Sequence, residues 1–303
     1  MDNHFGWILD VLVIVIAAYV LISNAKRGLT KVIVLCSGYI VATLLSSMLS
    51  GFAAPLLYET VARDNSISTL ETVNSKVDLT ELFTDAMEKE NFGFYIDSRH
   101  VEKILNGEKR GKFDDLLFDY VVSQTGAEPY SKERFVSMLN DAFISGYSKE
   151  LQERTPRYVG MYFRRTAVSD PQLMRDFVTI SGDEKMTAQD RAVFIEDRFS
   201  AEPSQLTLRI FVYLIIFSVL MVFAALLSAG LQNRIFFNVT EKTDHFLGGL
   251  IGLLEVAAML VLLTLIVRLI ILLSGDQASW CNETMIESTG VFRYLYHRFN
   301  LMI

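Results

Sequence analysis

Apolar residues are concentrated in four stretches of this chain, and polar residues dominate the segments between and after them. The stretches span 5–23, 32–57, 207–231 and 247–273. The second contains no charged residue, and the fourth contains only Glu255 and Arg268. Since about 20 apolar residues in a helix cross a hydrocarbon core of about 30 Å, each stretch predicts a transmembrane helix.

The first stretch lies near residue 1 and has to be distinguished from a secretory signal peptide. It carries Asp10, no Lys or Arg precedes its apolar run, and Lys26, Arg27 and Lys31 follow it. A signal peptide has its basic residues before the apolar run, so this stretch is predicted to be a retained membrane helix.

The region 58–205 has the pattern of a helical domain outside the membrane. Its Phe135, Leu139 and Phe143 recur at i, i+4 steps, the spacing of one helical face, and 187–190 has the residues of a helix start. It contains no regular alternation of apolar and polar residues of the kind that marks a strand. Helices are predicted over 68–90, 99–106, 112–124, 131–154, 171–180 and 187–199.

These patterns together predict an all-α polytopic membrane protein. Two transmembrane hairpins, within 1–57 and 206–273, flank the helical domain at 58–205, and a tail covers 274–303. Short loops keep their Lys and Arg on the cytoplasmic side, and loops 24–31 and 232–246 are the basic ones. Both termini and the domain 58–205 are therefore expected to be extracytoplasmic.

Charge and composition narrow the function classes. The chain has a net charge of −7, and 58–205 holds 19 basic and 27 acidic residues. No basic surface for nucleic acid is expected from that balance. Cys36 and Cys281 are too few and too far apart for a disulfide framework or a zinc site, and no nucleophile elbow, phosphate loop or redox motif occurs. We therefore expect neither an enzyme nor a bound cofactor or metal.

Small residues predict how two of the membrane helices pack. The second helix has five of them four residues apart, and the fourth begins with the pair Gly248 and Gly252. In lipid, helices approach closely along such surfaces, so we expect these two surfaces to pair; the alternative is that the ridge meets a second copy of the chain. The ridge consists of Gly38, Ala42, Ser46, Ser50 and Ala54.

Asp10, Glu255 and Arg268 are ionisable residues at membrane depth, where each is costly and needs a reason. Asp10 is near the outer end of the first helix, where it either pairs with Arg209 or Arg268 or reaches water while both arginines extend to the headgroups. Glu255 lies close to the bilayer midplane. It is either neutral or hydrogen-bonded within a bundle, or it faces a path for protons or ions.

Three sequence motifs resemble those of the colicin V production proteins (CvpA-type), a family of bacterial inner-membrane proteins. Residues 26–31, Lys-Arg-Gly-Leu-Thr-Lys, are similar to the family's turn between the first two helices, with Arg27 and Gly28 at its centre. Residues 243–252 are similar to its approach to the last helix, and 287–296 resemble its tail. The matching residues of the second motif are Asp244, Leu247, Gly248 and Gly252.

The resemblance covers about 1–57 and 206–303 and departs from the family at two places. His245 stands where a basic residue is usual, and Leu254 with Glu255 stands where an Arg-Gly pair is common. The insertion 58–205 is not covered. From the residues alone, Asp244 is expected to cap the fourth helix, and Gly28 to form a tight turn.

Two functions are consistent with these observations. The resemblance implies a membrane scaffold or accessory factor in toxin or bacteriocin production or export and in envelope physiology, located in the bacterial cell membrane. Its outer domain would bind a protein or peptide partner, and homo-oligomers or other membrane proteins are expected as further partners. The alternative is an oligomeric transporter or channel subunit in which Glu255 lines a proton or ion path, because four helices are few for a monomeric transporter.

Overall fold

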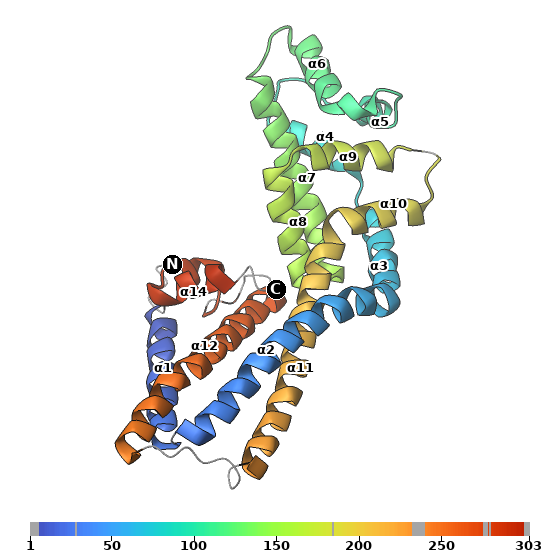
Figure 1. Cartoon of the computed structure of the whole chain (residues 1–303). Coiled ribbons are helices and arrows are strands. Elements are labelled where there is room, and N and C mark those ends of the chain that lie inside the picture. The colour runs from blue at the N-terminus through green and yellow to red at the C-terminus, as the bar shows by residue number, and fades with distance from the viewer. Residues whose placement is uncertain are drawn as a thin grey trace. The chain divides into compact units, whose positions relative to one another are not determined.

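The computed structural model of the chain describes residues 6–27, 29–183, 185–231, 240–274, 278 and 280–299. The structure is 86% helix, and the described residues contain no strand, so the all-α expectation is confirmed. The chain divides into two compact units (Figure 1). Unit 1 comprises Met1–Tyr58 and Gln205–Ile303, and unit 2 comprises Glu59–Ser204.

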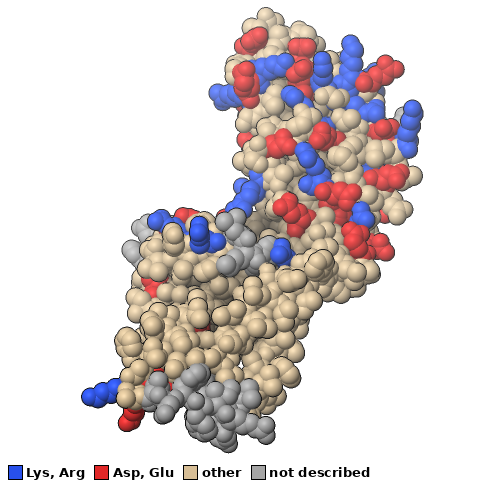
Figure 2. All heavy atoms as spheres, in the orientation of Figure 1, with Lys and Arg blue, Asp and Glu red and all other residues tan. Residues whose placement is uncertain are grey.

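Unit 1 is built on four long helices, and each is long and apolar enough to cross a membrane, as predicted. They are α1 (Trp7–Arg27), α2 (Leu29–Leu57), α11 (Ala201–Leu231, which starts in unit 2) and α12 (Glu241–Ser274). Each is longer than the apolar stretch that predicted it, because polar residues continue the helix at one or both ends. Figure 2 shows that the visible faces of these helices are almost free of charged residues, as a lipid-facing surface requires.

Helix α12 is the central helix of unit 1. In its most apolar window 44% of the residues are buried inside the protein, against 22–28% in the other three helices. It packs along both α1 and α2, the three helices lying side by side in Figure 1. Two short helices, α13 (Glu283–Glu287) and α14 (Val291–Arg298), follow α12, and α14 contacts both α1 and α12.

In its described residues, 59–183 and 185–204, unit 2 has eight α-helices around an aromatic core. They are α3 (Arg63–Lys76), α4 (Leu79–Lys89), α5 (Ser98–Leu105), α6 (Phe113–Thr125), α7 (Lys132–Arg154), α8 (Arg157–Ser169), α9 (Gln172–Ser181) and α10 (Ala188–Ile195). Two π-helical turns, η1 (Tyr58–Ala62) and η3 (Glu196–Ser200), and the 3₁₀ turn η2 (Arg110–Lys112) complete it. At its centre Phe143 lies 5.1 Å from Phe177 and 5.7 Å from Phe163, ring centre to ring centre. Such aromatic pairs stabilise a core beyond the area that they bury.

Local sequence signals account for most boundaries in unit 2. Ser131 caps α7 by accepting a hydrogen bond from the Arg134 N–H, and Thr187 with Asp190 forms a complete capping box on α10, at the helix start predicted over 187–190. The single helix predicted over 68–90 is wrong: α3 ends at an extended Val77, and Asp78 caps a new helix by accepting from the N–H groups of Thr80 and Glu81.

Candidate functional site

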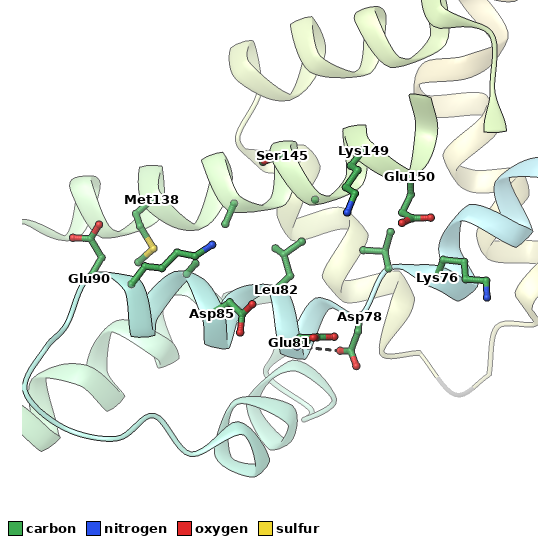
Figure 3. Close-up of a pocket in the computed structure, with 15 residues that line it drawn as sticks. Lys76, Asp78, Glu81, Leu82, Asp85, Glu90, Met138, Ser145, Lys149 and Glu150 are labelled. Atoms are coloured by element: carbon green, nitrogen blue, oxygen red, sulfur yellow. Dashed lines mark hydrogen bonds between the residues drawn. The ribbon is translucent and has the colours of Figure 1, made fainter. Parts of the chain in front are cut away.

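A groove between α4 and α7 is a candidate site in unit 2 (Figure 3). Its volume is about 580 Å³, and it runs along the two helices rather than into the core. Apolar side chains of both helices form its floor, among them Leu82 and Ala86 from α4 and Met138 and Ala142 from α7. A groove of this kind accommodates an extended or helical segment better than a small compact molecule.

Carboxylates dominate the rim of this groove. Glu81 and Asp85 lie on the exposed face of α4, and neither forms an ion pair with any residue that the structure describes. The carboxyl of Asp78 is already engaged with the first turn of α4. Of the residues that line the groove, five are acidic and three, Lys76, Lys89 and Lys149, are basic. The rim is therefore net negative.

A glycine lets α4 and α7 approach each other beneath the groove. A Cβ placed on Gly146 of α7 would lie 1.8 Å from Cδ1 of Leu82. The Leu82 side chain thus occupies the space that any larger residue at 146 would fill. Gly146 sets the depth of the groove floor.

A second candidate site lies inside unit 1, around Glu255 of α12. This carboxyl is buried and accepts a hydrogen bond of 2.7 Å from Nδ2 of Asn24 in α1. The side chain of Tyr39 in α2 lies beside this carboxyl. Nearby, the Cys36 thiol donates to the Ile251 carbonyl at 3.4 Å. Glu255 therefore links α12 to α1 by a hydrogen bond and lies beside α2, which is the hydrogen-bonded arrangement among the alternatives for it.

Asn24 itself leaves one polar atom without a partner. Its side chain is fully buried, and its Oδ1 accepts no hydrogen bond from the described residues. A buried acceptor that stays unpaired beside a carboxyl is costly.

Helices α2 and α12 pack against each other, but the glycines of the two predicted surfaces face other helices. Along the ridge, Ala42, Ser46, Ser50 and Ala54 are buried, and a Cβ on Gly38 would lie 2.6 Å from the Cβ of Ala224 in α11. The glycines of α12 instead allow α1 to pack closely against it. A Cβ on Gly252 would lie 2.7 Å from Nδ2 of Asn24, and one on Gly249 would lie 3.6 Å from the Cβ of Ala25.

The residues that enter α12 hold the start of α2. The expectation that Asp244 caps its own helix is wrong, because α12 already begins at Glu241. Asp244 Oδ1 instead accepts a hydrogen bond of 2.9 Å from the backbone N–H of Leu29, at the first residue of α2. His245 Nδ1 lies 2.6 Å from the carbonyl oxygen of Ala25.

The other residues of the family motifs differ in how exposed they are. Arg27 is exposed, Gly248 is buried in α12, and Leu247 is half-buried. Gly28 lies outside the described residues.

Asp10 holds the C-terminal tail, a role that neither alternative for it included. Its Oδ2 accepts from the N–H of Gly290 at 2.7 Å, and its Oδ1 accepts from Val291 at 2.9 Å and Phe292 at 2.8 Å. These are the free N–H groups at the start of α14, which a carboxylate satisfies well.

The two arginines near Asp10 in depth have other neighbours. Arg268 is buried, 6% exposed, and its guanidinium carbon lies 4.9 Å from the ring centre of Tyr296 in α14, so it does not extend to the headgroups. Arg209 lies beside Gly51 of α2. The tail is thus fastened to unit 1 at Asp10 and at Arg268.

Sequence reasoning missed Asn24, Tyr39 and the groove. Asn24 lies one residue beyond the predicted end of the first apolar stretch, so the hydrophobic pattern does not indicate that it is buried. The groove depends on how α4 and α7 meet, which no local pattern encodes. In the described part of the chain no group of three or more His, Cys, Asp or Glu side chains could hold a metal ion. Comparison with known proteins finds no matching family model, no matching curated protein and no matching solved structure.

Proposed function

We propose that this chain is an accessory or scaffold protein of the bacterial cell membrane that recruits a partner through the α4–α7 groove of unit 2. Its four apolar helices would form two hairpins, with unit 2, both termini and the tail on the extracytoplasmic side. The resemblance to the colicin V production family adds toxin or bacteriocin production or export and envelope physiology as the setting. The observation that carries the proposal is an apolar-floored, acid-rimmed groove.

The occupant that fits this groove is a basic amphipathic helical segment of another protein. Its apolar face would cover Leu82, Met138 and Ala142, and its Lys or Arg side chains would pair with Glu81 and Asp85. Helix-in-groove recognition uses this combination of an apolar strip and flanking charges. Charge complementarity of this kind sets the choice of partner and the association rate.

Binding of model peptides to the full chain in detergent tests this proposal. The probe is a helical peptide with Leu on one face and Lys on the other, and its control carries Glu in place of Lys. We expect the Lys peptide to bind roughly tenfold more tightly, with the difference removed in the double variant Glu81→Lys, Asp85→Lys. Equal binding of both peptides, or no effect of the double variant, would contradict the proposal. A matched control is Asp141→Lys, a charge change on α7 outside the groove lining.

The proposed topology has its own test in intact cells. Single cysteines at Ser66 and Lys242, introduced after replacing Cys36 and Cys281, are treated with a membrane-impermeant thiol reagent. We expect labelling at position 66 and protection at 242. Reaction at 242 in unbroken cells would reverse the orientation.

Glu255 favours a second candidate function, an oligomeric proton or ion path. The supporting observation is its burial beside the unpaired Oδ1 of Asn24. Glu255→Gln keeps an acceptor for Asn24 but cannot release a proton, so it should abolish a proton-coupled flux in reconstituted vesicles and leave peptide binding in the groove intact. A flux that is unchanged by this variant would exclude Glu255 from the path.

A further inference from the structure

A separate hollow lies in unit 2 between α5, α6 and the loop that precedes α5, and we call it the α5–α6 pocket. Its volume is about 630 Å³. Nine residues line it, and none of them is Lys or Arg. Three carry aromatic rings, Tyr95, His100 and Tyr120, and two carry carboxylates, Asp97 and Asp119.

Two of the three rings, those of His100 and Tyr120, are held in place before any ligand arrives. His100 stacks on Tyr120, with ring centres 4.4 Å apart and planes inclined by 26°. The Tyr120 hydroxyl accepts a hydrogen bond of 3.2 Å from the backbone N–H of Asp97, and Phe94 packs edge-on against the same ring at 5.8 Å. Fixed rings lose little conformational freedom on binding, which favours affinity.

Tyr95 stands out because it is 80% exposed while its neighbours Phe94 and Ile96 are packed into unit 2. The loop that presents it starts with two residues of positive φ, Asn91 at 52° and Gly93 at 83°. Asparagine and glycine tolerate this conformation best, so the turn is encoded locally. The turn directs Tyr95 to the mouth of the pocket and leaves its ring available to a ligand.

The two carboxylates of the pocket can still bind a cation. Asp97 uses Oδ1 to cap α5 through the Arg99 N–H at 3.0 Å. Asp119 is exposed, and neither aspartate forms an ion pair with a residue in the described ranges. Two carboxylates without a basic partner make the pocket attractive to a cation and unattractive to a phosphate.

We propose that the α5–α6 pocket binds a small alkylated ammonium ion. The faces of tyrosine rings attract such cations, and alkyl groups on the nitrogen lower the cost of removing it from water. The carboxylates add a longer-range attraction. A bare metal ion would need more oxygen ligands than the two carboxylates supply. This pocket is distinct from the α4–α7 groove, and its occupation does not depend on the proposed scaffold function.

Ligand-observed NMR on the full chain in a maltoside detergent tests the proposal. The probe is choline, and 3,3-dimethylbutan-1-ol is its uncharged control of the same shape. We expect a saturable saturation-transfer signal for choline and a several-fold weaker one for the alcohol. Phosphocholine should also bind more weakly than choline, because its phosphate would face Asp97 and Asp119; this arm distinguishes a free ammonium compound from a lipid headgroup.

Variants locate the site. Tyr95→Ala should weaken choline binding by roughly twofold to fivefold, the range of an exposed cation–π contact, while Tyr95→Phe should retain it. Asp119→Asn should weaken binding too, and Asp85→Asn, which lies in the other groove, should not. Equal signals from choline and the alcohol, equal or tighter binding of phosphocholine, or choline binding unchanged in Tyr95→Ala and Asp119→Asn would each overturn the proposal. Tyr95 and Asp119 are both exposed, so neither change threatens folding.

Discussion

The carboxylate of Asp10 accepts a hydrogen bond of 2.7 Å from the backbone N–H of Gly290, 280 residues further along the chain. Together with the bonds from Val291 and Phe292, this contact satisfies the start of α14 with a side chain from α1. The tail is therefore part of unit 1, joined to the first helix as well as to the fourth.

Replacing Asp10 by Ala should release the start of α14. Three N–H groups lose their acceptor, and loss of a helix cap costs about 0.5–2 kcal/mol. Hydrogen exchange followed by mass spectrometry should show faster exchange across 290–296, with α4 of unit 2 as an internal reference. Asp10→Asn, which keeps one acceptor oxygen, should give an intermediate effect. Unchanged exchange in Asp10→Ala would show that Arg268 and Tyr296 suffice to hold the tail.

Two glycines of α12 should respond differently to the same substitution. Gly252→Ala places a Cβ 2.7 Å from Asn24 Nδ2 and 2.9 Å from Asn24 Cβ, so α1 has to move and the hydrogen bond to Glu255 is disturbed. Overpacking of this kind costs about 1–3 kcal/mol. Gly249→Ala makes an ordinary contact at 3.6 Å and should be neutral or stabilising, by at most about 1 kcal/mol. Thermal unfolding in detergent measures both, and equal shifts would mean that α1 does not pack on α12 at this point.

A matched pair of glycines in unit 2 tests the floor of the groove. Gly146→Ala forces Leu82 out of its place, since the new Cβ would overlap Cδ1, and we expect a loss of stability of about 1–3 kcal/mol with weaker peptide binding. Gly160→Ala in α8 meets only Gln152 Cγ at 3.4 Å and should be tolerated. Thermal unfolding and the peptide titration are measured on both. A Gly146→Ala protein with unaltered binding would place the occupant away from Leu82.

Glu196 should make the stability of unit 2 depend on pH. It precedes the apolar stretch of α11, its side chain is fully buried, and neither carboxyl oxygen has a hydrogen-bond partner among the described residues. Burial, with a smaller contribution from the neighbouring Asp197 charge, raises its pKa from 4.5 to about 7. The folded state thus holds this proton more tightly than the unfolded state, so stability should fall as pH rises from about 4.5 to about 7 and then level off.

Glu196→Gln removes that dependence. Because one pKa unit corresponds to about 1.4 kcal/mol, the variant should gain stability on the order of 3 kcal/mol over the parent protein at pH 8 and little at pH 4.5. Thermal unfolding at the two pH values measures the difference, and the exposed Glu71→Gln serves as control. A Gln variant whose melting temperature follows that of the parent at both pH values would show that Glu196 is reached by water.

The sequence was sufficient for the four membrane helices, because length and apolar content alone are decisive in a bilayer. Helix caps such as Thr187 and Asp190 could also be predicted, since a capping bond joins residues within one helical turn. Helix α8 was missed, because three arginines and Gly160 interrupt its apolar pattern. Its inward face, Val159, Phe163 and Ala167, does keep the i, i+4 spacing and was the signal available.

The sequence did not predict which distant segments pack against each other. The small residues of α2 and α12 identify surfaces that are buried. Any two surfaces of small residues can pack together, so only the folded structure shows which helices meet. The same holds for Asp10 and Asp244. Both sit near helix ends, where a carboxylate finds free N–H groups, yet each serves a helix other than its own.

The hydrogen bond between Asn24 and Glu255 joins residues 231 positions apart, and this separation bears on how the protein is made. Synthesis at about 5–20 residues per second leaves Asn24 waiting on the order of tens of seconds before its acceptor emerges from the ribosome. During that interval the side-chain amide of Asn24 lacks its hydrogen-bond partner, Glu255. Until α12 packs against α1, that amide depends on water, headgroups or another protein for its hydrogen bonds.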